Sequence, residues 1–191
     1  MRFIVIIIAT LIVMLPAAIF GIPTLGVYFS DVDHATVPGQ MHYIPTPATM
    51  FYGFVYAHNW DCYLTAAEFA VEFDPQIIYA GFDIPEGWLF MGDPINGLSL
   101  TWWPPISDYY EDYHWLCVLK MMIFEPCITE GGTLADMPIV IVPHPVSGGM
   151  YGVCWPGYQM FNFVVGQKSI VCPYEIDIED QSWGAIKAQF K

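Results

Sequence analysis

Aromatic side chains between positions 88 and 115 form the densest group of residues that could bind a ligand. The group contains Trp88, Phe90, Trp102, Trp103, Tyr109, Tyr110, Tyr113 and Trp115. Exposed indole and phenol rings combine an apolar face with a polar edge, which suits stacking on sugar rings. Trp102, Trp103, Tyr109 and Tyr110 are therefore candidate carbohydrate-binding residues. The alternative is that the rings fill a core. Adjacent Trp102 and Trp103 must point to opposite faces of a strand, which predicts that one is buried.

An acidic cluster follows these tryptophans in the sequence. Asp108, Glu111 and Asp112 supply three carboxylates within a short stretch. Because calcium prefers oxygen ligands, the cluster is a candidate site for a structural calcium ion. Its spacing does not match an EF-hand loop, and the alternative is a solvated acidic loop. No other cofactor is predicted.

Residues arranged for catalysis are missing from the sequence. Glu68 and Glu72 lie four positions apart in an alternating segment, so on a strand they are about 13 Å apart, whereas glycosidase carboxyl groups are about 5–9.5 Å apart. A solvated strand face explains the pair better. The sequence contains neither a G-x-S-x-G nor an H-E-x-x-H motif. We therefore predict that the protein is not an enzyme.

The five cysteines predict disulfides. None of them forms a C-x-x-C pair, which argues against a zinc or thioredoxin-like site. Cys62 begins one predicted strand and Cys127 follows the end of another, so the two cysteines meet if these strands are antiparallel neighbours. This predicts the bonds Cys62–Cys127 and Cys154–Cys172. Cys117, in the middle of a strand, is then a buried free thiol.

Charge and hydropathy restrict the location of the protein and its partners. Five Lys and Arg against nineteen Asp and Glu give a formal charge of −14, which argues against nucleic-acid binding. The composition, 55% hydrophobic, excludes intrinsic disorder. Residues 1–21 combine one Arg, an apolar run and small residues, the layout of a secretory signal peptide, with an uncleaved anchor as the alternative. No later stretch reaches membrane length. We therefore predict a secreted or cell-envelope protein with no membrane span after cleavage.

The remainder of the chain is predicted to be all-β. Fifteen of the sixteen Pro and fifteen of the sixteen Gly lie in this part and divide it into short apolar runs, which is typical of a sandwich or barrel. The predicted strands span 26–29, 49–57, 64–73, 77–82, 98–103, 113–124, 138–142, 158–165 and 169–171. In the third of these, Ala67, Phe69 and Val71 alternate with Glu68 and Glu72, as on a strand with one wet face. We predict a single antiparallel β-sandwich of about eight or nine strands over residues 22–175.

The C-terminal tail, residues 176–191, is the one predicted helical segment. Ser182 can cap a short helix in which Trp183, Ile186 and Phe190 share one face. A helix this short is marginal alone, so it must dock either on its own sandwich or on an envelope partner.

The order of several structural motifs carries a family resemblance. Gly26–Phe29 follows the signal, the alternating Ala67–Val71 strand and the long Trp115–Leu119 strand come next, and Cys172–Pro173 and Ser182–Lys187 close the chain. In this order the chain resembles uncharacterised exported bacterial single-domain β-sandwich proteins, which are broadly similar to cohesin and carbohydrate-binding modules. The resemblance implies a cohesin-like or jelly-roll-like fold and an extracellular location, and no catalytic residues.

Two functions are consistent with these observations. The first is a non-catalytic structural or interaction protein of the bacterial cell envelope, whose partner is another envelope protein. The second is a carbohydrate-binding protein that holds a polysaccharide with exposed Trp and Tyr.

Overall fold

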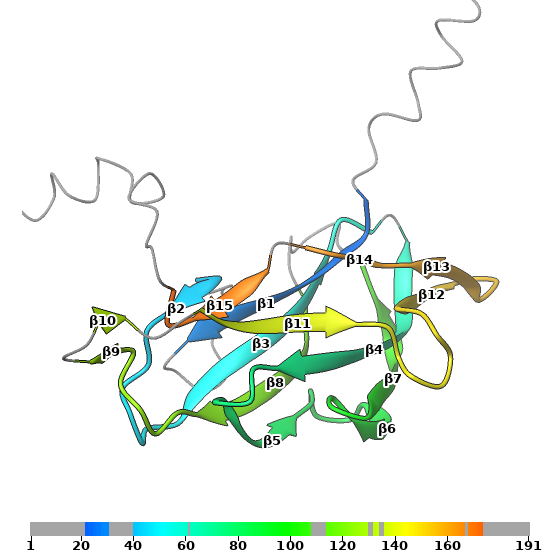
Figure 1. Ribbon diagram of the computed structural model, residues 1–191. Helices are drawn as coiled ribbons and strands as arrows, with labels where there is room; N and C mark the ends of the chain where they lie inside the picture. Colours follow the sequence, from blue (N-terminus) through cyan, green and yellow to red (C-terminus); the bar gives the residue numbers. More distant parts are fainter. Residues whose placement is uncertain are drawn as a thin grey trace, which may run out of the picture.

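The computed structural model describes residues 22–30, 40–60, 62–107, 114–129, 132–133, 136–166 and 168–173, and the elements in these ranges are β-strands (Figure 1). The strands are β1 (Thr24–Ser30), β2 (His42–Tyr43), β3 (Phe51–His58), β4 (Tyr63–Phe73), β5 (Ile78–Asp83), β6 (Leu89–Asp93), β7 (Gly97–Ile106), β8 (His114–Met122), β9 (Ile128–Thr129), β10 (Gly132–Thr133), β11 (Met137–Val142), β12 (Tyr151–Trp155), β13 (Gln159–Asn162), β14 (Val164–Val165) and β15 (Ser169–Val171). The predicted all-β sandwich class is confirmed. Among the described residues, no helix is long and apolar enough to cross a membrane.

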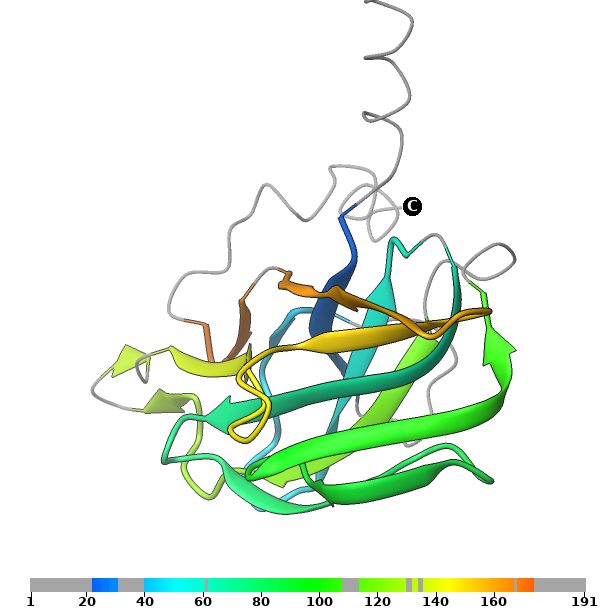
Figure 2. The same cartoon turned by 90° about the vertical axis from the view of Figure 1, so that its right-hand side faces the viewer.

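Two sheets make up the sandwich. The first has the order β14-β1-β3-β8-β5. The second has the order β13-β12-β4-β11-β15-β2, with β7 on the other edge of β4 and β6 beyond β7. Figure 2 shows the sheet with β4 and β7 in front of the sheet with β1, β3 and β8. The small β9–β10 ladder lies outside both sheets.

Strand β4 organises the second sheet because it has three neighbours. Its first half pairs with β12 and its second half with β11, so these two strands lie end to end along one edge. Strand β7 pairs with the opposite edge. Both β4–β7 and β4–β12 contain a register shift near the start of β4. Two hydroxyl groups bridge this irregular region: Thr65 donates to the Val153 carbonyl at 3.1 Å, and Thr101 donates to the Thr65 carbonyl at 3.2 Å.

The core lies between the inward faces of the two sheets. On β4, Ala67, Phe69 and Val71 are buried in it, whereas Glu68 and Glu72 point outward, as the alternation predicts. On β8, Cys117 is a buried free thiol, as predicted, and burial raises its pKa well above the ordinary range. The alternating pattern thus assigned the faces of β4 correctly, because successive side chains of a strand point to opposite sides.

The disulfide pairing predicted from the sequence is wrong. The structure links Cys62 to Cys154, with Cα atoms 5.7 Å apart, and Cys127 to Cys172, with Cα atoms 5.1 Å apart. The prediction assumed that β4 and β8 are neighbours, but they belong to different sheets. Strand β12 runs antiparallel to β4 instead, with Cys154 opposite Leu64, and this register brings Cys154 beside Cys62.

Other sequence predictions also need correction. The ladders are not all antiparallel, since β1–β14 and β15–β2 are parallel. Strands β2, β6, β9, β10 and β12 were not predicted, and the predicted strand 158–165 is divided into β13 and β14 at Phe163. The described residues therefore contain more strands than the predicted eight or nine. The predicted C-terminal helix lies outside the described residues.

Candidate functional site

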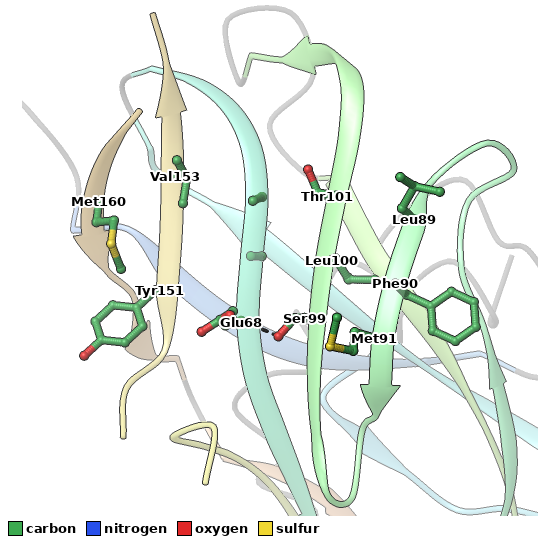
Figure 3. A pocket seen from close by; sticks show the side chains of 12 residues that line it. Glu68, Leu89, Phe90, Met91, Ser99, Leu100, Thr101, Tyr151, Val153 and Met160 are labelled. Carbon is green, nitrogen blue, oxygen red and sulfur yellow. Dashed lines mark hydrogen bonds between the residues drawn. The ribbon is translucent and has the colours of Figure 1, made fainter. Parts of the chain in front are cut away.

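A shallow groove of about 520 Å³ crosses the outer face of the second sheet (Figure 3). Its floor comes from β4 and β7, one wall from β6, and the other from β12 and β13. The lining residues are Ala66, Ala67, Glu68, Leu89, Phe90, Met91, Ser99, Leu100, Thr101, Tyr151, Val153 and Met160. Apart from Glu68, the side chains that face out from the floor strands (Ala66, Ser99 and Thr101) are small, so the groove is hollowed between the larger side chains of its walls.

The alternation of the strands places these side chains on the outer face. On β7, Leu98 and Leu100 are buried in the core, and Ser99 lies between them on the opposite face. On β12, Val153 lies opposite Met160 of β13 and also opposite Ala66 of β4. The walls and the floor are thus held in register by the sheet ladders.

The walls expose large apolar side chains to solvent. Leu89 is 70% exposed, Met91 is 76% exposed and Met160 is 63% exposed. Leu89 and Met91 lie on one wall and Met160 on the other, so both sides of the groove expose apolar side chains. Methionine side chains are flexible and adapt to surfaces of different shape.

Glu68 is the acidic residue of the groove floor. Its Oε1 accepts a hydrogen bond of 3.0 Å from the Ser99 hydroxyl, so the carboxylate is held against the floor. Among the described residues that line the groove, none is a histidine, lysine or arginine.

An aromatic row lies near the start of β4, where Tyr63 is opposite Trp155 of β12. Trp103, Trp155 and Tyr63 form this row, with ring centroids 6.0 Å apart for Trp103–Trp155 and 6.3 Å for Tyr63–Trp155. Both ring pairs are close to perpendicular, at 80° and 76°. A second hollow of about 370 Å³, lined by Trp103 and Tyr158, continues the groove toward this row.

The two adjacent tryptophans point to opposite faces, as predicted from their position on one strand. Trp102 is only 5% exposed; its ring stacks on Trp88 at 4.0 Å and its Nε1 donates a 2.9 Å hydrogen bond to the Leu64 carbonyl. Trp103 is 69% exposed. Of the two candidate carbohydrate-binding tryptophans, Trp103 alone therefore presents a ring face to solvent, and Trp102 belongs to the core.

The remaining predicted site residues lie outside the described residues. These are Tyr109 and Tyr110 of the predicted aromatic site and Asp108, Glu111 and Asp112 of the predicted calcium site. Within the described part of the chain, no group of three or more His, Cys, Asp or Glu side chains could hold a metal ion.

A tight turn holds β6 against β7 and so positions one wall of the groove. Oδ1 of Asp93 accepts hydrogen bonds of 2.9 Å from the amides of Ile95 and Asn96, and its Oδ2 accepts one of 2.9 Å from the Asn96 side chain. The hydrogen bonds from Asn96 are the main cause that lowers the pKa of Asp93 below its ordinary value. The turn is therefore most stable with Asp93 ionised.

Sequence reasoning missed most of the groove. Strands β6 and β12 were not predicted, so Leu89, Met91, Tyr151 and Val153 were never considered as one surface. A usable signal was present: Trp88–Met91 is an uninterrupted apolar run bounded by Gly87 and Gly92, which is typical of a short strand. Nothing local indicates that this run faces solvent, because exposure depends on which strands are its neighbours.

The sequence matches no protein-family model and no curated protein. In fold, the chain is similar to cohesin modules. The cohesin module of a family 33 glycoside hydrolase from Clostridium perfringens has a TM-score of 0.52 at 8% identity, over 80% of this chain and 98% of the module. A non-cellulosomal cohesin from Archaeoglobus fulgidus has a TM-score of 0.51 at 9% identity, over 84% of this chain and 96% of that one.

A third similar structure is a type II cohesin from Acetivibrio cellulolyticus, solved as a cohesin–X-dockerin complex. It has a TM-score of 0.51 at 11% identity, over 79% of this chain and 99% of that chain. At these identities the likeness concerns the fold. The broad similarity to cohesin expected from the sequence is confirmed at that level.

Proposed function

We propose that this chain is an exported, non-catalytic interaction module of the bacterial cell envelope, and that it binds a partner protein on the outer face of the second sheet. The observation that carries the proposal is the groove between Leu89 and Met91 on one side and Met160 on the other. Its apolar walls favour association by removal from water, at about 25 cal/mol for each Å² buried.

The fold and the chemistry of the groove support this choice over catalysis. The described residues that line the groove supply one carboxylate, that of Glu68, and no histidine, lysine or cysteine. The similar cohesin of Acetivibrio cellulolyticus was solved in complex with an X-dockerin, so the fold can serve as a protein-binding module. For our chain, the partner is proposed to be another envelope protein, held by side chains of the sheet.

Export is part of the same proposal. The signal-like layout of residues 1–21 and the presence of two disulfides are both typical of a protein that folds in an oxidising compartment. We place the sandwich at residues 22–175 and a separate tail at 176–191. Mass spectrometry of the protein from its host tests the cleavage site: a terminus at Ile22 is expected, and an intact Met1 would show an anchor.

Site-specific photo-cross-linking in host cells tests the binding face. A benzophenone amino acid replaces Met91 or Met160 on the groove walls, and Phe124, which is exposed beyond the end of β8, serves as the control position. We expect both wall positions to give the same discrete adduct with one other protein, and the control to lack it. Absence of an adduct at both walls, or the same adducts at Phe124, would refute this function.

Carbohydrate binding is a second candidate, and the exposed aromatic row favours it. Trp103 offers an open indole face beside Trp155 and Tyr63. A glycan array with the oxidised protein checks this candidate. Binding that disappears in Trp103→Ala would support it, and absence of binding to every polysaccharide on the array would remove it.

A further inference from the structure

The outer edge of β6 has no neighbouring strand in the described part of the chain. Strand β6 pairs along its whole length with β7, from Leu89 opposite Thr101 to Asp93 opposite Gly97, and with no other strand. A strand at the edge of a sheet presents a row of main-chain N–H and C=O groups to its surroundings. The free edge of β6 is therefore a template on which another extended segment can pair.

Among the described strands, the other sheet edges are shorter or less regular than β6. Strand β5 is interrupted by a register shift between Tyr79 and Gly81. Strand β13 has four residues. The edge strands β2 and β14 and both strands of the β9–β10 ladder are two residues long. Strand β6 has five residues, with no bulge, proline or lysine, which are the features that usually prevent edge pairing.

The side chains of β6 indicate what kind of segment would pair there. Met91 points toward the groove in Figure 3, and Phe90 points away from it and packs against Phe82 with ring centroids 5.5 Å apart. All three large side chains of the strand, Leu89 included, are exposed. Successive side chains of an added strand point to alternate faces of the sheet. Apolar residues of that strand would therefore cover the apolar side chains of β6 on both faces of the sheet.

Charge at the ends of β6 selects between possible occupants. Glu86 precedes the strand and Asp93 ends it, and residues 84–97 contain no Lys or Arg. A second copy of this chain would place like charges opposite each other, which destabilises strand pairing, and would bring together two molecules of formal charge −14. A segment with Lys or Arg at its ends would instead complement the acidic residues.

We propose that the free edge of β6 accepts an extended apolar segment of a separate protein, flanked by Lys or Arg, which adds to the sheet as a new strand. This mode differs from binding on the sheet face, because the main chain supplies the contacts and the side chains of β6 supply selectivity. It does not depend on the proposed function.

A displayed library of random linear peptides, selected on the full oxidised protein, tests the proposal. We expect enriched peptides to contain a run of consecutive apolar residues, which covers both faces of β6, and to have basic ends. Hydrogen–deuterium exchange of the protein with the best peptide should slow the amides of Leu89–Asp93, and leave β5 and β13 unchanged. Slowed exchange in β12 and β13 without β6 would show binding on the face and overturn the proposal, as would a selection that enriches no peptide.

A matched pair of lysine variants tests whether the peptide binds at the edge of β6. Met91→Lys adds a charge to β6, and Ile78→Lys adds the same charge to β5 on the corresponding edge of the first sheet. We expect Met91→Lys to weaken peptide binding at least tenfold and Ile78→Lys to leave it unchanged. Thermal melting confirms that both variants fold. Equal peptide affinity of Met91→Lys and the unmodified protein would overturn the proposal. If Met91→Lys fails to fold, the hydrogen–deuterium exchange of the unmodified protein with the peptide tests the proposal instead.

Discussion

Two glycines with the same backbone angle, one before β6 and one within it, provide a sharp test of how this strand is held. Gly87 precedes the strand and Gly92 lies within it, and both have φ of +83°. A Cβ atom built on Gly87 meets nothing within 4 Å, whereas one on Gly92 would overlap the carbonyl oxygen of Gly97 and lie 3.3 Å from its carbonyl carbon. Two single variants, Gly87→Ala and Gly92→Ala, therefore separate the two effects: the first introduces backbone strain alone, and the second introduces the same strain together with steric overlap.

The expected costs follow from these surroundings. An L-residue in the left-handed region costs about 1–2 kcal/mol, partly offset by about 0.4–1 kcal/mol from the reduced entropy of the unfolded chain, so Gly87→Ala should lose about 1 kcal/mol of unfolding free energy. Gly92→Ala has the same strain and must also push β6 away from β7, with overpacking of about 1–3 kcal/mol. We expect Gly92→Ala to be less stable than Gly87→Ala by about 2 kcal/mol.

Chemical denaturation of the oxidised proteins measures the difference, with equal slopes as the check that both variants unfold in the same way. The groove gives a second readout, because a displaced β6 should also weaken any partner bound between Leu89 and Met160. Equal stability of the two alanine variants would refute the reasoning, since it would mean that β6 moves away from Gly97 at no cost.

Three further predictions concern stability. Replacing both Cys62 and Cys154 by alanine opens a link across 92 residues, and should cost about 4.6 kcal/mol of unfolding free energy by the chain-entropy relation; denaturation measures it, and a loss under about 1 kcal/mol contradicts it. Trp102→Ala should cost about 3–5 kcal/mol of unfolding free energy, because removing the stacked ring leaves a core cavity. Trp103→Ala should change the unfolding free energy by about 0.5 kcal/mol or less. Similar losses of stability in the two variants would contradict the assigned faces. The pKa of Asp93 is lowered in the folded protein, so its ionised carboxylate stabilises the fold above the unfolded pKa of 3.8. This stabilisation is lost as pH falls through the lower folded pKa. The difference in melting temperature between the unmodified protein and Asp93→Asn should therefore shrink in acid.

The alternation of side-chain directions along a single strand explains why the faces of some residues could be predicted from the sequence. The inward positions of Ala67, Phe69 and Val71 follow from the alternation of apolar and acidic residues along one strand. The opposite directions of Trp102 and Trp103 need only the knowledge that both belong to one strand. Such statements involve neighbours in sequence, and the geometry of the extended backbone determines them.

Strand neighbours were not predictable in the same way. The bond of Cys62 to Cys154 depends on β12 lying beside β4, and the groove depends on β6 and β13 lying at opposite sides of the same sheet. Many short apolar runs in this chain have compatible patterns, so several pairings satisfy each strand considered alone. The positions of Cys62 and Cys127 at the ends of two strands predicted that β4 and β8 are neighbours. In the sandwich, β4 and β8 belong to different sheets.

The sequence by itself therefore determined the all-β class and the inward and outward faces of single strands. Each of these depends on residue type and on a repeat of two residues, which acts over a few neighbouring positions. Only the tertiary structure decided the disulfide partners, the apolar groove and the free edge of β6. These features join segments distant in sequence, and their choice depends on satisfying the hydrogen bonds and burying the apolar faces of all the strands together.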